Sequence, residues 1–191
     1  GFNTPNAGTI TVEGENILGL TQSKIRGLGV SLVPEDRMLF GIAGTASIEE
    51  NILSDRCADK RFNKGPLFNM KAIHEESDRL IQEYTVLCKS RKQQVGMLSG
   101  GNIQKVVVAR EFSNDPVLIL ADQPTRGIDV GAKATIYQLI SKLKKSGMGV
   151  LFFTSDMSEI PVVCDRVIVL SGGEISGRIE GRDVTIGKIL Q

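Results

Sequence analysis

The residues best suited to chemistry begin with the run Leu98-Ser99-Gly100-Gly101-Asn102. Two adjacent glycines let the backbone approach a ligand closely. The helix expected to follow them starts with free N–H groups and with the positive end of its dipole. With the hydroxyl of Ser99 as a further donor, these groups suit a phosphate. The same residues also suit an ordinary turn before an amphipathic helix, so this short run leaves both interpretations open.

A carboxylate closes the next apolar segment, Leu118–Asp122. This segment is typical of a buried strand, and α/β proteins bind ligands where parallel strands end. Asp122 can hold Mg²⁺ beside nucleotide phosphates, or it can be a solvated residue that opens a turn. The run Pro124–Gly131 then leads into another helix, for which Asp129 is a candidate N-cap.

In this order and spacing, the three features resemble the ABC ATPase family, and the resemblance covers essentially the whole chain. Leu98–Asn102 is similar to the signature motif of that family, Leu118–Asp122 to its Walker B strand, and Gly127–Asp129 to its D-loop. The resemblance implies ATP and Mg²⁺ as cofactors. It implies that Asp122 binds the metal and that the nucleotide is bound by Leu98, Ser99, Gly100, Gly101, Asn102 and Asp129.

The resemblance also places Glu35, Gln123 and Ser155 at catalytic positions. Glu35 stands where the Q-loop usually has Gln. Gln123 stands where most relatives have a general-base Glu, and an amide can orient water but cannot accept a proton at neutral pH. Ser155, in the switch loop, stands where many relatives have His, and its hydroxyl cannot carry a positive charge. We therefore expect slow or absent hydrolysis at the site around Asp122, while the signature residues complete the site of a partner ABC domain.

Three motifs are similar to those in the second ABC domain of bacterial importers for simple sugars and nucleosides: Val33–Arg37, Gly100–Val106 and Pro124–Lys133. Gln123 is more typical of nucleoside importers, so the solute stays open. The 191 residues contain no G-x-x-x-x-G-K-[ST] phosphate loop (P-loop), and Gly1–Pro5 resembles the stretch after that loop's helix. The resulting expectation is an N-terminally truncated domain with negligible ATP affinity on its own.

The elements that position these residues follow from alternating apolar runs and helical patterns, which indicate an α/β fold with a mostly parallel sheet. The resemblance implies a P-loop NTPase-like (RecA-like) core over residues 1–37 and 95–191, with an N-terminal β piece, and an inserted helical subdomain over 38–94. Strands are expected at 9–13, 29–33, 117–121 and 149–153, helices at 70–84, 131–146 and 158–164, and a hairpin at 166–170 and 174–179.

The amino-acid composition gives little reason to expect nucleic acid as a partner or a membrane-spanning segment. A hydrophobic content of 41% supports a packed core, and 23 basic against 22 acidic residues give no electrostatic reason to expect nucleic acid. The apolar runs are too short to span a bilayer. The resemblance implies a second ABC domain, transmembrane permease subunits and, indirectly, a solute-binding protein as partners. It implies a location on the cytoplasmic face of the bacterial inner membrane.

Two functions therefore remain in view. The leading one is the ATP-hydrolysing subunit of an importer, and the alternative is a catalytically degenerate ABC module that completes or regulates a partner's ATP site. Gln123 and Ser155 favour the alternative, whereas the signature residues and Asp122 are compatible with both. A soluble ABC protein acting on nucleic acid or ribosomes is disfavoured, because two tyrosines and no tryptophan leave little for base stacking.

Overall fold

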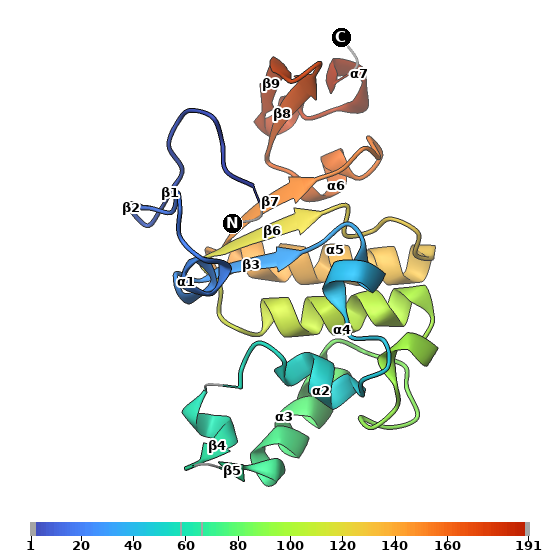
Figure 1. Ribbon diagram of the computed structural model, residues 1–191. Coiled ribbons are helices and arrows are strands. Elements are labelled where there is room, and N and C mark those ends of the chain that lie inside the picture. Colours follow the sequence, from blue (N-terminus) through green and yellow to red (C-terminus); the bar gives the residue numbers. More distant parts are fainter. Residues whose placement is uncertain (1–2, 58, 66, 190–191) are drawn as a thin grey trace.

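The computed structural model describes residues 3–57, 59–65 and 67–189, and a three-stranded parallel sheet lies at its centre (Figure 1). The strand order is β3-β6-β7, with bounds Val30–Val33, Leu118–Asp122 and Gly149–Phe153. Leu118 is in register with Val30 on one side and Gly149 on the other. Because the strands are parallel, their carboxyl ends meet at one edge, where ligands of α/β folds bind.

Two long helices, α4 (Gly100–Phe112) and α5 (Val130–Lys145), pack on one face of this sheet and on each other. The β6 residues Ile119 and Ala121 are fully buried in the core formed there. On the inward side of α5, Ile136 and Ile140 are buried, and Leu139 and Leu143 pack against the same core. The predicted α/β fold is therefore confirmed, with a parallel sheet whose helical cover comes from α4 and α5.

The opposite face of the sheet is more open than the sequence predicts. Apolar runs such as β7 are typical of strands buried on both faces. However, Leu151 and Phe153 of β7 are 48% and 43% exposed, and Leu120 of β6 is half-buried. The expectation of fully buried strands is wrong for this face, because α4 and α5 cover only the other one.

The chain between β3 and α4 is mostly helical. It contains a short helix at Arg37–Gly41, α2 (Ile48–Leu53), α3 (Met70–Glu83) and a small hairpin of β4 (Asn63–Lys64) and β5 (Leu67–Phe68). Asn69 precedes α3, but its side chain makes no cap hydrogen bond with the helix and donates instead to the Arg61 carbonyl at 3.4 Å. Figure 1 shows α4 between the sheet and the pair α2 and α3.

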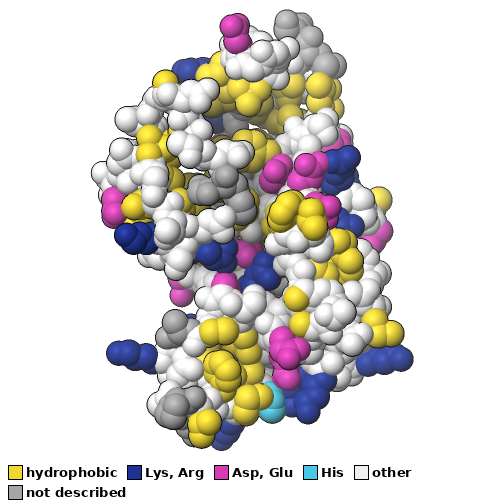
Figure 2. Space-filling model, in the orientation of Figure 1, with side chains coloured by type: hydrophobic (Ala, Val, Ile, Leu, Met, Phe, Trp, Pro, Cys, Tyr) yellow, Lys and Arg dark blue, Asp and Glu magenta, His cyan; other side chains and the backbone are white. Residues whose placement is uncertain are grey.

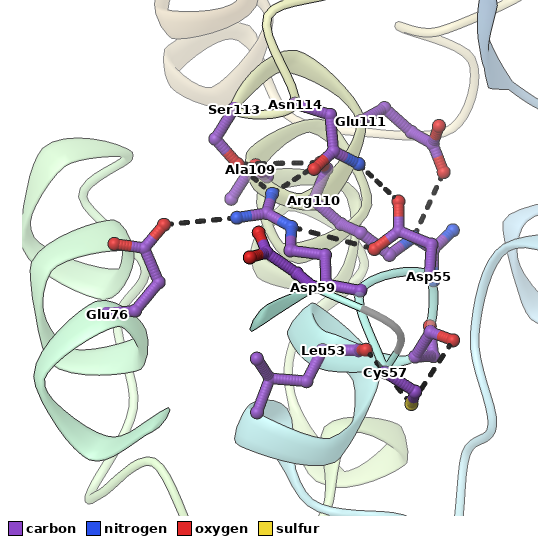
Figure 3. Close-up of polar contacts among 12 residues, drawn as sticks. Leu53, Asp55, Cys57, Asp59, Glu76, Ala109, Arg110, Glu111, Ser113 and Asn114 are labelled. Atoms are coloured by element: carbon purple, nitrogen blue, oxygen red, sulfur yellow. Dashed lines mark hydrogen bonds and ion pairs between the residues drawn. The ribbon is translucent and has the colours of Figure 1, made fainter. Parts of the chain in front are cut away.

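Buried ionic contacts join this helical part to the end of α4 (Figure 3). Arg56 is only 4% exposed and donates from Nη1 to Glu76 of α3 at 3.0 Å. Its Nη2 donates to the Arg110 carbonyl in the last turn of α4 at 2.9 Å, and also to the Ser113 hydroxyl. A cation at this position stabilises the negative end of the helix dipole.

A second set of ion pairs connects the helical part and α4 to the N-terminal part of the chain. Arg26, on α1 (Gln22–Gly27), pairs with Asp55 at 2.8 Å and with Glu111 of α4 at 2.9 Å. Glu111 also accepts a hydrogen bond from the Leu32 amide at 3.3 Å, so it links α4 to β3. The helical part and the sheet are therefore both attached to the last turns of α4.

The remaining strands and α-helices lie outside the central sheet. They are β1 (Thr11–Val12), β2 (Glu15–Asn16), α6 (Ile160–Val163), β8 (Arg166–Ser171), β9 (Glu174–Glu180) and α7 (Ile186–Ile189). The predicted strand 9–13 is shorter because Glu13 adopts a φ of +50° in a turn. The predicted helix 158–164 is shorter because Ser158 binds Asp156 through both its amide and its hydroxyl. Within the described ranges, none of the helices has the length and apolarity to cross a bilayer.

Candidate functional site

Two of the three predicted catalytic residues, Gln123 and Ser155, lie together at the carboxyl edge of the sheet. Gln123 follows β6 with a left-handed φ of +47°. Its backbone N–H donates at 3.0 Å to the carbonyl of Phe153, the last residue of β7. Its side-chain Nε2 donates to Ser155 Oγ at 3.1 Å, and its Oε1 accepts from the Ser155 amide at 3.4 Å. The nitrogen and the oxygen of the Gln123 side-chain amide are therefore both hydrogen-bonded to Ser155.

Asp122, the predicted metal ligand, is the last residue of β6 and is half-buried. Among residues 3–57, 59–65 and 67–189, no hydrogen bond or ion pair engages its carboxylate, and no cluster of three acidic, Cys or His side chains surrounds it. A Mg²⁺ ion that takes its other ligands from phosphates and water needs only one or two carboxylates. Asp122 fits that requirement, but the phosphate-cradling loop such an ion accompanies is not among the 191 residues.

Glu35, the third predicted catalytic residue, is tied to the D-loop. It follows β3 and forms an ion pair with Arg126. Two residues later, Arg37 donates from Nη1 to the Arg126 carbonyl at 2.8 Å and from Nη2 to the Gly127 carbonyl at 3.2 Å. Gly127 has a φ of +67°, which favours glycine. The segment after β3 and the D-loop are thus joined by two arginines, for which the sequence analysis proposed no role.

The predicted signature residues lie at the start of α4. Ser99 is exposed and occupies the N-cap position, but its side chain does not cap the amides of the helix. Instead Ser99 Oγ accepts from Asn102 Nδ2 at 2.9 Å, while Asn102 Oδ1 accepts from the Leu87 amide at 2.8 Å. Among the described residues the Ser99 hydroxyl donates to none, and it lies beside the positive end of α4. Leu98 is half-buried and packs against the main core.

The two glycines of this motif are required by close packing. A Cβ at Gly100 would lie 2.9 Å from Arg37 Nη2, and a Cβ at Gly101 would lie 2.9 Å from both Asp129 Oδ2 and Ala132 Cβ. Gly100 is half-buried, whereas Gly101 is buried. Both glycines were expected to let the backbone approach a ligand, but at Gly101 the contact that excludes a side chain is with Asp129 and with Ala132 of α5. Binding of a nucleotide by these residues stays a prediction.

Asp129, the predicted D-loop acid, connects the starts of the two helices. Its Oδ1 accepts from the Ala132 amide at 2.9 Å, so it is the N-cap of α5 as expected. Its Oδ2 faces Gly101 at the start of α4. Two positive helix ends therefore share one carboxylate, which each of them stabilises.

Sequence reasoning missed a buried carboxylate just behind this edge. Glu159 is 2% exposed and accepts hydrogen bonds from Thr125 at 2.6 Å, from Lys133 at 2.9 Å and from Thr154 at 3.1 Å. The Glu159 carboxylate, followed by that of Asp156, raises the pKa of Lys133. The only sequence signal was an acid directly before the apolar run Ile160–Val163.

Comparisons with known proteins agree with this architecture. A family model described as "ABC transporter" matches residues 1–126. The chain is 36% identical, over all of its 191 residues, to the galactose/methyl galactoside import ATP-binding proteins of Salmonella typhimurium and of Escherichia coli strain K12. It spans 38% of the length of these relatives.

Solved structures show the same fold. A dimeric bacterial ABC transporter cassette superposes with a TM-score of 0.77 at 22% sequence identity, covering 94% of this chain and 76% of that one. A nucleotide-free ATP-binding cassette from an ABC transporter gives a TM-score of 0.76 at 20% identity, covering 100% of this chain and 76% of that one. At this level of identity, the likeness establishes the fold alone.

Proposed function

The chain belongs to the ABC transporter family as an ATP-binding domain, and from that premise we propose that it works in the ATP-binding and ATP-hydrolysing subunit of a bacterial importer for a simple sugar or a nucleoside. The observation that carries this proposal is the exposed Ser99 at the start of α4. There Ser99 keeps a free hydroxyl proton beside a positive helix end, an arrangement suited to a phosphate.

We assign the site residues in two groups. Ser99, Gly100, Gly101 and Asn102, with Leu98 behind them and Asp129 beside them, would complete the ATP site of a partner ABC domain. Asp122 would hold Mg²⁺ at the chain's own site, where Gln123, Ser155 and Glu35 would orient water. Nucleotide binding at that own site requires a P-loop supplied from outside the 191 residues. The motifs support placement in the second of two fused ABC domains.

The proposed solute is a sugar or a nucleoside, and the names of the galactose-import relatives support the sugar. The proposed partners are permease subunits in the bacterial inner membrane, with the chain on their cytoplasmic side, and a solute-binding protein. Uptake of a labelled hexose and a labelled nucleoside by cells with and without the gene would separate the two solutes. Loss of hexose uptake alone supports the sugar, and loss of nucleoside uptake alone supports the nucleoside.

An exposed apolar segment supports the permease as a partner. Met38, Leu39 and Phe40 are 53%, 69% and 65% exposed on the short helix that connects the sheet to the helical part. Figure 2 shows hydrophobic side chains exposed around this segment and, lower in the view, over the part that contains β4 and β5. Leu39→Asp should abolish co-purification with the permease, whereas Ile168→Asp, at an exposed apolar residue of β8, should not.

The test of the main function uses the intact subunit, with its P-loop and permease, in lipid vesicles. Ser99→Glu places a carboxylate at the start of α4, where a phosphate is proposed to bind, and should lower ATPase activity about 100-fold or more. Ser90→Glu, at an exposed serine outside the motif, should leave the activity unchanged. Equal activity of the two variants would contradict the proposal.

A regulatory module is the second candidate, and the contact between Gln123 and Ser155 favours it. With both ends of the Gln123 amide occupied, the side chain has less freedom to orient a water molecule. In a pure module, Gln123→Ala should leave the ATPase rate of the assembled complex unchanged. In an enzyme that uses its own site, the same substitution should lower the rate.

A further inference from the structure

The buried carboxylate of Glu159 lies where three segments of the chain meet. Its Oε1 accepts from Thr125 Oγ1 at 2.6 Å and from Lys133 Nζ at 2.9 Å, and its Oε2 accepts from Thr154 Oγ1 at 3.1 Å. Thr125 follows β6 in the loop that carries Gln123, and Thr154 follows β7 in the loop that carries Ser155. One carboxylate thus binds both loops of the candidate catalytic edge, while Lys133 ties it to α5.

The hydroxyls have little freedom to rotate. Thr125 is 2% exposed, and a buried carboxylate accepts hydrogen bonds but cannot donate them when ionised. Each threonine must therefore direct its proton toward Glu159. At Thr154 this leaves the oxygen lone pairs for the Asp156 amide, which donates to Thr154 Oγ1 at 3.0 Å. Glu159 therefore holds Thr154 directly and Asp156 through Thr154, while Lys133 also binds Asp156 at 3.0 Å.

We propose that Glu159 is a positioning residue that holds the Gln123 loop and the Ser155 loop at the separation where their side chains bind each other. It acts through Thr125 and Thr154, because its own carboxylate is buried behind the edge and contacts neither Gln123 nor Ser155 in the described part of the chain. Lys133 supplies the charge that makes burial of the carboxylate tolerable. For its effect on ATP hydrolysis, this inference rests on the proposed function.

The geometry predicts different effects for three substitutions. In Glu159→Gln the amide oxygen can keep Lys133 and Thr125, which share Oε1, but Thr154 then faces an NH2 group that it can only accept from, so its charge-assisted hydrogen bond is lost. The Ser155 loop should therefore loosen first. Thr154→Val should loosen the same loop, and Thr125→Val should loosen the Gln123 loop instead. Glu174→Gln makes the same chemical change at an exposed residue of β9 and serves as the control.

Hydrogen exchange of the purified chain measures this directly, without nucleotide. Glu159→Gln should increase exchange of the amides in 153–158 about tenfold, with a smaller increase in 123–127, and should leave the β8–β9 hairpin unchanged. In the intact transporter it should lower kcat about tenfold with little change in KM for ATP, because positioning acts on the reacting geometry rather than on binding. Glu174→Gln should change neither measurement.

The hydrogen-exchange and ATPase results for Glu159→Gln separate the positioning role from the proposed function. Unchanged exchange in 153–158 would overturn the positioning role, as would a uniform increase over the whole chain, because the latter indicates general destabilisation. Faster exchange confined to the two loops supports the role even if the wild-type transporter shows no ATPase activity, and in that case it is the proposed function that fails. Faster loop exchange with unchanged kcat in an active transporter would overturn the catalytic part of the inference.

Discussion

Gln123 and Ser155 bind each other twice across the carboxyl edge of the sheet, once through the Gln123 Nε2 group and once through its Oε1. Neither side chain can act as a base at neutral pH. Together they join the ends of β6 and β7 by side-chain contacts, in addition to the hydrogen bond from the Gln123 amide to the Phe153 carbonyl. The lack of a base in this pair is the reason to expect slow hydrolysis at the site around Asp122.

Gln123→Glu should therefore raise the ATPase rate of the intact transporter. A carboxylate at this position keeps the hydrogen-bond acceptor for Ser155 and adds a group that can take a proton from water. General-base catalysis typically contributes ~10²–10⁴-fold, and because Ser155 still differs from the usual His we expect about tenfold or more. Steady-state phosphate release measures the rate, with Gln82→Glu on the exposed side of α3 as the control. A rate equal to or below that of the wild type would count against this interpretation.

Gly101→Ala should destabilise the protein, because its Cβ would meet both Asp129 Oδ2 and Ala132 Cβ at 2.9 Å. Forcing an extra carbon into such a contact typically costs about 1–3 kcal/mol. Gly27→Ala, at the end of α1, has nothing within 4 Å of the added carbon and no left-handed backbone. It should change stability little or raise it slightly. Urea unfolding followed by circular dichroism compares the two, and equal midpoints would contradict the packing role of Gly101.

Arg56→Ala should be more destabilising than Arg79→Ala, although both arginines donate to Glu76. The Arg56 side chain is 2% exposed and also binds the end of α4, whereas the Arg79 side chain is 51% exposed. Removing one partner of a buried ion pair typically costs about 3–5 kcal/mol, and removing an exposed partner about 0–1 kcal/mol. Denaturant unfolding of the two variants measures this difference, and similar losses would show that the buried network is not the main attachment of the helical part.

The two tyrosines of the chain, Tyr84 and Tyr137, should titrate late. Burial raises the pKa of each to about 12, from an ordinary value of 10.0. The unfolded chain therefore loses these protons first, so stability should fall as the pH rises from 10 toward 12. The absorbance of tyrosinate at 295 nm follows ionisation in the native protein and in denaturant. Tyr84→Phe should remove half of the signal and reduce the alkaline loss of stability, and titration of the native protein near pH 10 would contradict the burial effect.

The sequence predicted those parts of the fold that depend on neighbouring residues. The apolar run Gly149–Phe153 forms β7 with the expected bounds, and α5 starts at the predicted cap, Asp129. The assignment of Glu35, Gln123 and Ser155 to catalytic positions came from the family resemblance, and only the position of Asp122 was expected from the rule that ligands bind where parallel strands end.

Contacts between distant residues could not be predicted in this way. Glu159 binds Thr125, which lies 34 residues before it, and its neighbouring sequence indicates only an acid at the start of an apolar helix. Gly101 was assigned to ligand approach because its contact with α5 depends on how two helices cross. The openness of one sheet face was also missed, because apolar strands predict burial without showing which element provides it.

The two ends of α4 are held by different parts of the molecule: Gly101 packs against Asp129 of the D-loop, and the Arg110 carbonyl is bound by Arg56 of the helical part. A helix of 13 residues is ~20 Å long. If Arg56 turned the far end of this rod by about 5° about a fixed centre, the signature residues would shift by ~1 Å. This is enough to make or break a hydrogen bond. A displacement of the helical part would therefore be transmitted along α4 to Ser99.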